Sequence, residues 1–218
     1  FPMLKNKLFA ISPSDKNGGL ASLVLNNDSD HMNWIEGTGT WGVPFGFEFV
    51  RMEKNGNSVT AYYKRDTLLV TAVRTMENNL LRERYSFRNS GTFDLYFLRG
   101  DIGLYANFSD DYDSSPVCIT SRCNAHIWSG GENSYIHALK MAPFHTELAL
   151  VLTKGSLDSY SIRRRQDNPS VDRGDFLLHP KPFHLLPGET RELEWIVTAF
   201  PRGKFKETML AQPNGVFI

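Results

Sequence analysis

Cysteine is scarce in this sequence, and its scarcity excludes two classes of protein. Only Cys118 and Cys123 occur among the 218 residues. Two cysteines cannot form a disulfide-rich scaffold or a zinc site with four cysteine ligands. We expect both thiols to be reduced, which favours a reducing compartment such as the cytoplasm.

The sequence also lacks an excess of charge and a long apolar run. Lys and Arg together number 24, and Asp and Glu together number 24, so there is no net field to attract a polyanion. No apolar run approaches the roughly 20 residues needed to cross a bilayer. We therefore expect neither a nucleic acid nor a membrane as a partner.

Several chemical motifs are missing as well. The sequence has no Gly-rich phosphate loop, no nucleophile elbow of the form G-x-S-x-G and no H-E-x-x-H zinc helix. The acidic loop FSDDYDSSP (residues 108–116) alternates carboxylates as a calcium loop does. It lacks the glycine and the glutamate that such a loop has at its sixth and twelfth positions. We expect no cofactor and no metal.

What the sequence does contain is a succession of short segments rich in β-branched and aromatic residues, separated by clusters of Gly, Asn, Asp and Pro. This pattern is typical of antiparallel sandwiches and barrels. A single twisted sheet rarely exceeds about ten strands, so this many segments predict an all-β fold with two large stacked antiparallel sheets, a supersandwich. The expected strands lie at residues 7–12, 20–26, 45–52, 58–65, 67–75, 80–87, 92–99, 116–128, 135–141, 148–153, 160–164, 175–180 and 192–200.

We expect the whole chain, residues 1–218, to form one domain, because no linker, repeat or low-complexity tract interrupts it. At most one short helix is expected, at residues 205–212, before the PNG turn. The RNSG stretch (residues 88–91) predicts a hairpin between its flanking strands. The chain lacks a Met at position 1 and stops on the apolar run GVFI, so we expect a fragment of a longer protein.

The segment LLRERYSF (residues 80–87) shows the alternation most clearly. Leu81, Glu83 and Tyr85 fall on one face of an extended strand, whereas Arg82 and Arg84 fall on the other. The arginine face must therefore meet solvent or acidic partners.

Three stretches resemble galactose-mutarotase-like β-supersandwich domains: LFAISPSDKNGGLASLVLNNDSD (residues 8–30), YSFRNSGTFDLYF (85–97) and LLPGETRELEWIVTAF (185–200). The resemblance implies a first hairpin, a strand-turn-strand unit in mid-domain and a closing strand with Trp195 inward. Such domains occur as free-standing aldose epimerases and as the amino-terminal module of glycoside hydrolases, phosphorylases and polysaccharide lyases.

The catalytic pattern of the epimerases is not matched. They carry a histidine in an Asn-His-aromatic-Phe-Asn stretch, whereas the nearest sequence here is Asn124-Ala125-His126-Ile127-Trp128. Glu189, Glu192 and Glu194 lie late in the chain, where the epimerases have a glutamate, but in a turn and on an ordinary strand. No catalytic residue can therefore be assigned.

The richest candidate site is CNAHIWSGGENSYIHALKM (residues 123–141). The SGGEN turn places His126 and Trp128 beside Tyr135 and His137 on adjacent strands. Imidazoles exchange protons near neutral pH, Glu132 is a carboxylate partner, and aromatic rings can stack on a sugar. The alternative is a structural hairpin with a buried tryptophan and two histidines bonded to backbone.

Two further groups are sugar-binding candidates. Trp34 and Trp41 flank the flexible GTG stretch, where each is either a stacking platform or a plug in the end of the sandwich. In SVDRGDF (residues 170–176), Arg173 stands between Asp172 and Asp175. An arginine there holds both carboxylates ionised, which opposes the raised pKa of a general acid. We interpret it as a charge-paired corner, with a clamp for sugar hydroxyls as the alternative.

These patterns favour a non-catalytic carbohydrate-associated module of a larger carbohydrate-active enzyme. Its expected partners are a carbohydrate and a catalytic domain of the same chain. Two alternatives stay open. One is a divergent aldose 1-epimerase that uses His126 and His137, and the other is a structural or adhesion sandwich without a sugar ligand.

Overall fold

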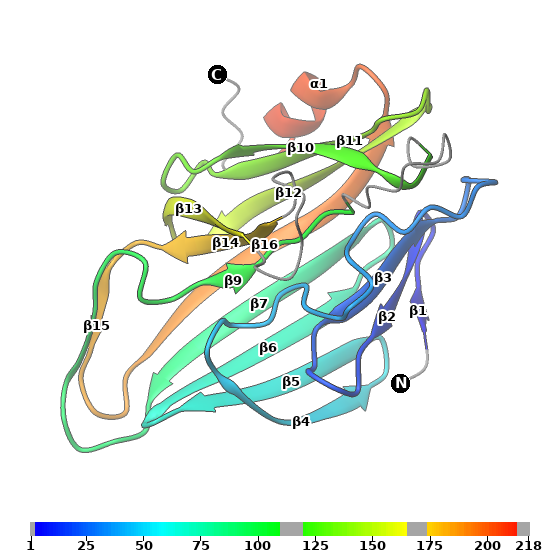
Figure 1. Cartoon of the computed structure of the whole chain (residues 1–218). Helices are drawn as coiled ribbons and strands as arrows, with labels where there is room; N and C mark the ends of the chain where they lie inside the picture. Colours follow the sequence, from blue (N-terminus) through cyan, green and yellow to red (C-terminus); the bar gives the residue numbers. More distant parts are fainter. Residues whose placement is uncertain (1–2, 110–119, 165–173, 213–218) are drawn as a thin grey trace.

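A computed structural model describes residues 3–109, 120–164 and 174–212 of the chain (Figure 1). Its largest element is an eight-stranded sheet in which all neighbours are antiparallel. The strands lie in the spatial order β10 (Cys123–Trp128), β11 (Tyr135–Lys140), β12 (Thr146–Lys154), β16 (Thr190–Pro201), β7 (Leu80–Asn89), β6 (Leu68–Met76), β5 (Ser58–Arg65) and β4 (Glu48–Asn55).

Smaller sheets lie over one face of this large sheet (Figure 1). One contains β1 (Leu4–Lys5), β2 (Phe9–Pro13) and β3 (Leu20–Leu25); a second contains β13 (Leu157–Arg164), β14 (Gly174–Pro180) and β9 (Leu104–Tyr105). A two-stranded ribbon pairs β8 (Leu95–Phe97) with β15 (Phe183–Leu185). The predicted all-β sandwich is confirmed, with its second layer divided into short sheets.

The alternation predicted for β7 decides which side chains enter the sandwich. Leu81, Glu83, Tyr85 and Phe87 are fully buried toward the smaller sheets, whereas Arg84 is exposed on the opposite face. We call this opposite face of the eight-stranded sheet the outer face. Since side chains alternate along every strand, neighbouring strands add their own alternate residues to each of the two faces.

A fully buried ion pair lies in the core. Arg74 Nε on β6 donates to Glu83 Oε2 at 2.9 Å, and both side chains are about 1% exposed. The other carboxylate oxygen accepts hydrogen bonds from the indoles of Trp41 at 2.8 Å and Trp195 at 2.9 Å. Gly42 packs directly against this ion pair. Its φ is +75°, and a Cβ added there would lie 2.4 Å from the Tyr85 hydroxyl, so this position requires glycine. Buried charges are tolerated only when they are paired and hydrogen-bonded in this way.

The hairpin predicted around residues 88–91 is wrong. β7 pairs with β6 on one edge and with β16 on the other, so it has no edge left for the next strand. β8 pairs with β15 instead. The Asn89 side chain holds this arrangement, because its Nδ2 donates to the carbonyls of Phe93 at 2.8 Å and Leu185 at 3.0 Å.

One helix, α1 (Phe205–Leu210), follows the last strand, as predicted. Its Met209 packs on the outer face against Ala149, Val151 and Ile196 of β12 and β16. Within the described residues, no helix has the length and apolar character that crossing a membrane requires.

Candidate functional site

The β10–β11 hairpin brings four of the predicted residues together. His126 lies directly opposite His137, and Trp128 lies opposite Tyr135. The two imidazole centroids are 6.3 Å apart. Ala149 of β12 packs against helix α1 on the outer face, and His137 pairs with Ala149. Because directly paired residues share a face of the sheet, all four side chains lie on the outer face. The predicted hairpin and its shared face are therefore confirmed.

His137 is held between two neighbours. Its Nε2 lies 3.0 Å from Glu147 Oε2 on β12, and its ring stacks on Phe205 of α1 with centroids 4.0 Å apart and planes at 3°. The His137 and Glu147 side chains are 16% and 7% exposed. This contact fastens α1 to the sheet and leaves His137 little access to a ligand. Glu147 was missed by the sequence reasoning, although a lone acidic residue in the apolar run TELALVLT was a signal.

Trp128 and His126 remain accessible on β10, which is an edge strand. Trp128 is 44% exposed, and His126 is also exposed. The indole packs closely over Gly130 in the following turn. A Cβ added at Gly130 would lie only 2.0 Å from Trp128 Nε1. Residues i and i+2 of a strand lie on one face about 7 Å apart, so the exposed His126 side chain shares its face of β10 with Trp128. We call these two side chains the Trp128 platform.

Glu132 is exposed in the same turn but lines a different hollow. That hollow has a volume of about 440 Å³ and also contains Lys181, Arg191 and Glu192. Glu132 is therefore placed among other charges, and no hydrogen bond between it and His126 or His137 is observed in the described part of the chain.

Trp34 and Trp41 lie in the core, 0% and 1% exposed. The Trp41 indole donates to Glu83 and packs edge-to-face on Phe108 at 5.0 Å. Neither tryptophan offers a ring face to a ligand, so the plug interpretation describes them better than the platform interpretation. Asp172 and Arg173 lie outside the described residues.

Asp175 has a partner that the sequence did not suggest. Asn107 Nδ2 donates to Asp175 Oδ1 at 3.1 Å and to Glu36 Oε2 at 3.0 Å. The Asn107 side chain is itself fixed, since its Oδ1 accepts from the Phe176 amide at 2.8 Å. Two carboxylates far apart in sequence are thus neighbours at the end of β14. Only the packing of β14 on the loops around Glu36 and Asn107 could reveal this pair.

A second ionic group lies on the outer face. Glu194 of β16 accepts hydrogen bonds from Thr153 at 2.7 Å, Arg84 at 3.1 Å and Arg82 at 3.0 Å. Burial raises the pKa of Glu194, but these three donors outweigh it and hold the pKa below the ordinary value of a glutamate. The arginine face of β7, expected to meet solvent or acidic partners, meets both, since Arg82 and Arg84 bond Glu194 and stay partly exposed.

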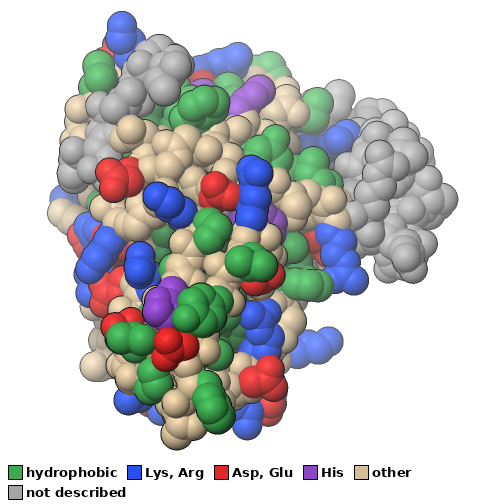
Figure 2. Space-filling model, turned by 90° about the vertical axis from the view of Figure 1, so that its left-hand side faces the viewer, with side chains coloured by type: hydrophobic (Ala, Val, Ile, Leu, Met, Phe, Trp, Pro, Cys, Tyr) green, Lys and Arg blue, Asp and Glu red, His purple; other side chains and the backbone are tan. Residues whose placement is uncertain are grey.

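The three most exposed large apolar side chains of the described residues lie on β8 or within two residues of it. Phe93 is 82% exposed, Leu98 70% and Tyr96 67%. Tyr96 stacks on His184, with centroids 4.4 Å apart and planes at 3°, and His184 Nε2 lies 3.1 Å from Asp94 Oδ2. Figure 2 shows that hydrophobic side chains at this end of the molecule are interspersed with charged side chains of both signs.

Comparison with solved structures identifies the fold. A polysaccharide lyase matches 95% of this chain with 27% identity and a TM-score of 0.79, and the chain spans 35% of the length of that lyase. A galactose mutarotase related enzyme from Lactobacillus acidophilus matches 91% of this chain and 97% of its own, with 10% identity and a TM-score of 0.56. A GH36 alpha-galactosidase from Geobacillus stearothermophilus matches 97% of this chain and 43% of its own, with 12% identity and a TM-score of 0.51.

No protein-family model and no curated protein sequence matches the chain. The structural matches extend over nearly all of it, and they include epimerase-type proteins, a lyase and a glycosidase. The chain therefore has the galactose-mutarotase-like β-sandwich fold that its sequence resembles, a fold shared with carbohydrate-active enzymes.

Proposed function

We propose that this chain is a non-catalytic carbohydrate-associated module of a larger carbohydrate-active enzyme, and that it contacts sugar through the Trp128 platform. The observation that carries the proposal is the match to about a third of a polysaccharide lyase at a TM-score of 0.79. A fold that forms one part of a longer carbohydrate-active enzyme is the expected form of such a module.

The state of the two histidines supports a non-catalytic role. A general acid or base must reach the atom whose proton it moves. His137 is largely covered by Phe205 and is bonded to Glu147. His126 is accessible, but it has no carboxylate partner among the described residues. Neither imidazole therefore combines access with an orienting carboxylate.

The chemistry of the Trp128 platform suits a sugar. The apolar face of a pyranose packs on an indole, while an imidazole offers a donor and an acceptor to its hydroxyls. An exposed tryptophan at the edge of a sheet needs a reason, whereas the three others, at positions 34, 41 and 195, are buried in the core.

The β8–β15 ribbon is the surface that we propose for packing on the catalytic domain. Tyr96 of β8 and the neighbouring Phe93 and Leu98 are the most exposed large apolar side chains of the described residues. Apolar patches with a polar surround mark interaction sites, and aliphatic side chains such as Leu98 suit a protein surface better than a sugar. The open reading frame around these residues tests this part, because a gene that encodes no catalytic domain would contradict it.

Intrinsic fluorescence and calorimetry test the sugar contact. Three of the four tryptophans are buried, so a glycan on the Trp128 platform should perturb the emission of Trp128 alone. We expect Trp128→Ala to abolish both the fluorescence change and the heat of binding. Tyr96→Ala, which removes a more exposed ring from the ribbon, should leave both unchanged. Absence of binding across a glycan array would favour a structural or adhesion sandwich instead.

An aldose epimerase is the second candidate, favoured by two observations. The chain matches 97% of a galactose mutarotase related enzyme, and the His137–Glu147 pair has the composition of an acid–base site. Anomerisation rates of free sugars separate the two functions. Rates that equal the uncatalysed rates across a sugar panel support the module, and acceleration that disappears in His137→Gln supports the epimerase.

A further inference from the structure

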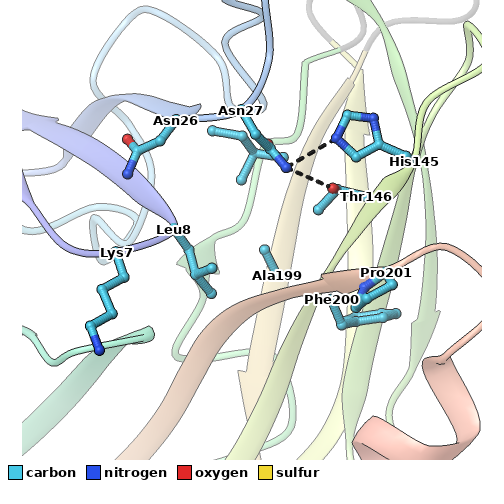
Figure 3. A pocket seen from close by; sticks show the side chains of 10 residues that line it. Lys7, Leu8, Asn26, Asn27, His145, Thr146, Ala199, Phe200 and Pro201 are labelled. Atoms are coloured by element: carbon cyan, nitrogen blue, oxygen red, sulfur yellow. Dashed lines mark hydrogen bonds between the residues drawn. The ribbon is translucent and has the colours of Figure 1, made fainter.

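A cleft opens where the sheet of β1–β3 meets the ends of β12 and β16, away from the Trp128 platform (Figure 3). Its volume is about 270 Å³, just below the range of roughly 300–1,000 Å³ that holds drug-sized ligands. Its apolar wall consists of Leu8, Leu25, Ala199, Phe200 and Pro201. The cleft is therefore of the size of one small molecule and is apolar on one side.

Besides Lys7 and Asn26, three polar side chains line the cleft, and they face one another in Figure 3. Asn27 Nδ2 lies 3.0 Å from His145 Nε2 and 3.2 Å from Thr146 Oγ1. An amide nitrogen can only donate, so His145 Nε2 must accept, and the proton of the neutral imidazole is on Nδ1. The hydrogen bonds thus orient all three groups before any ligand arrives.

This arrangement leaves hydrogen-bonding capacity unused at three atoms. Both hydrogens of the Asn27 amide are engaged, whereas its Oδ1 can still accept. His145 Nδ1–H and the Thr146 hydroxyl can still donate. None of these three groups has a further hydrogen-bond partner within the described residues. An acceptor and two donors, all uncharged, therefore belong to side chains that line the cleft.

We propose that this cleft binds a neutral monosaccharide. A sugar ring has one apolar face for the wall around Leu8 and Phe200, and it has vicinal hydroxyls that both donate and accept, as the three free functions require. The neutral polar set does not select an anion, and Lys7 on the rim is the sole charged residue of the lining.

The cleft is a second site, independent of the Trp128 platform. Trp128 lies opposite Tyr135, which pairs with Val151 of β12, five residues along the strand from Thr146. At about 3.4 Å per residue the two sites are roughly 17 Å apart along β12. Failure of either site therefore leaves the other unaffected.

Ligand-observed NMR with the whole chain tests the cleft, using glucose, galactose and rhamnose as neutral probes and glucuronate as an anionic probe. We expect saturable binding of a neutral sugar together with a shift of the His145 imidazole ¹⁵N resonances. Asn27→Ala and His145→Ala should each weaken binding about tenfold, the effect of one hydrogen bond. Thr146→Val keeps the shape of the buried side chain and should also weaken binding.

Two controls separate this site from the alternatives. Lys7→Ala should leave the affinity for the neutral sugar unchanged, because the polar set is uncharged, and Tyr96→Ala should leave it unchanged, because Tyr96 lies outside the cleft. The proposal is overturned if no neutral sugar saturates, if glucuronate binds more tightly and depends on Lys7, or if binding persists in Asn27→Ala and His145→Ala while Trp128→Ala abolishes it.

Discussion

Each face of β7 takes part in an arginine–glutamate ion pair, and the two pairs differ in their surroundings. Glu83 points into the sandwich, where Arg74, Trp41 and Trp195 satisfy its carboxylate in full. Arg82 and Arg84 point to the outer face, where they bond Glu194 while remaining 32% and 50% exposed. One residue step along the strand thus separates a buried ion pair from a partly hydrated one.

The difference lies in access to water. An ion pair without water must satisfy every donor and acceptor within the protein, so the inner group cannot change its partners without loss of stability. A partly hydrated group can exchange a protein partner for water at little cost. The inner face is therefore committed to holding the two layers together, and the outer face and sheet ends remain available for ligands.

The inner pair should give the largest effect on stability. Glu83→Gln removes the charge opposite Arg74 and should lower the free energy of unfolding by about 3–5 kcal/mol, the usual result of breaking a buried pair. Urea denaturation measures it. Glu53→Gln on the exposed Arg51–Glu53 pair is the control and should change nothing measurable.

A double variant sharpens this test. Arg74→Met with Glu83→Gln removes both charges but keeps an oxygen for the indoles of Trp41 and Trp195, so it should recover part of the loss. The carbonyls of Gly18 and Trp41, to which Arg74 donates, limit the recovery. A loss in Glu83→Gln of less than about 1 kcal/mol would contradict the structural role of the pair.

The ionic group around Glu194 on the outer face should give a smaller, pH-dependent effect on the free energy of unfolding. The pKa of Glu194 is lower in the folded chain than the ordinary value of about 4.5, so ionised Glu194 contributes stability above that ordinary value. This contribution, about 2 kcal/mol for hydrogen bonds to a charged group, should be lost as the pH falls through the lower, folded pKa. Unfolding curves of wild type and Glu194→Gln should therefore converge in acid, and a constant difference at all pH values would contradict the assignment.

The two stacked histidines should give the smallest effect on the free energy of unfolding. His137 and His184 each stack on a ring at 3° and bond a carboxylate, but His137 is covered and His184 is exposed. His137→Ala should lower the free energy of unfolding by about 1 kcal/mol, and His184→Ala by less, because an exposed stack competes with water. Thermal melts of the two variants make the comparison, and equal losses would show that α1 does not depend on His137.

Strand positions could be predicted from the sequence because alternation and turn residues act locally. Segments 58–65 and 135–141 nearly coincide with β5 and β11, and the facing of His126 and His137 followed from the short turn between them. Pairing beyond neighbours could not be predicted in this way. β8 joined β15 rather than β7, because β16, more than a hundred residues later, occupies the second edge of β7.

The residues of the candidate site also depended on contacts remote in sequence, which the sequence could not predict. The exposure of Trp128 and the burial of Trp34 and Trp41 could not be distinguished by composition, since all three are tryptophans near glycines. Glu36 and Asn27 had no signal strong enough to single them out, because each acquires its partner from a distant segment.

By itself, the sequence determined that the chain is a β-sandwich with a short final helix, because period-two alternation and turn chemistry depend on neighbouring residues. Only the tertiary structure decided which charges are buried, which aromatic rings are exposed and where clefts open. Those properties depend on contacts between strands remote in sequence and on the water that these contacts exclude.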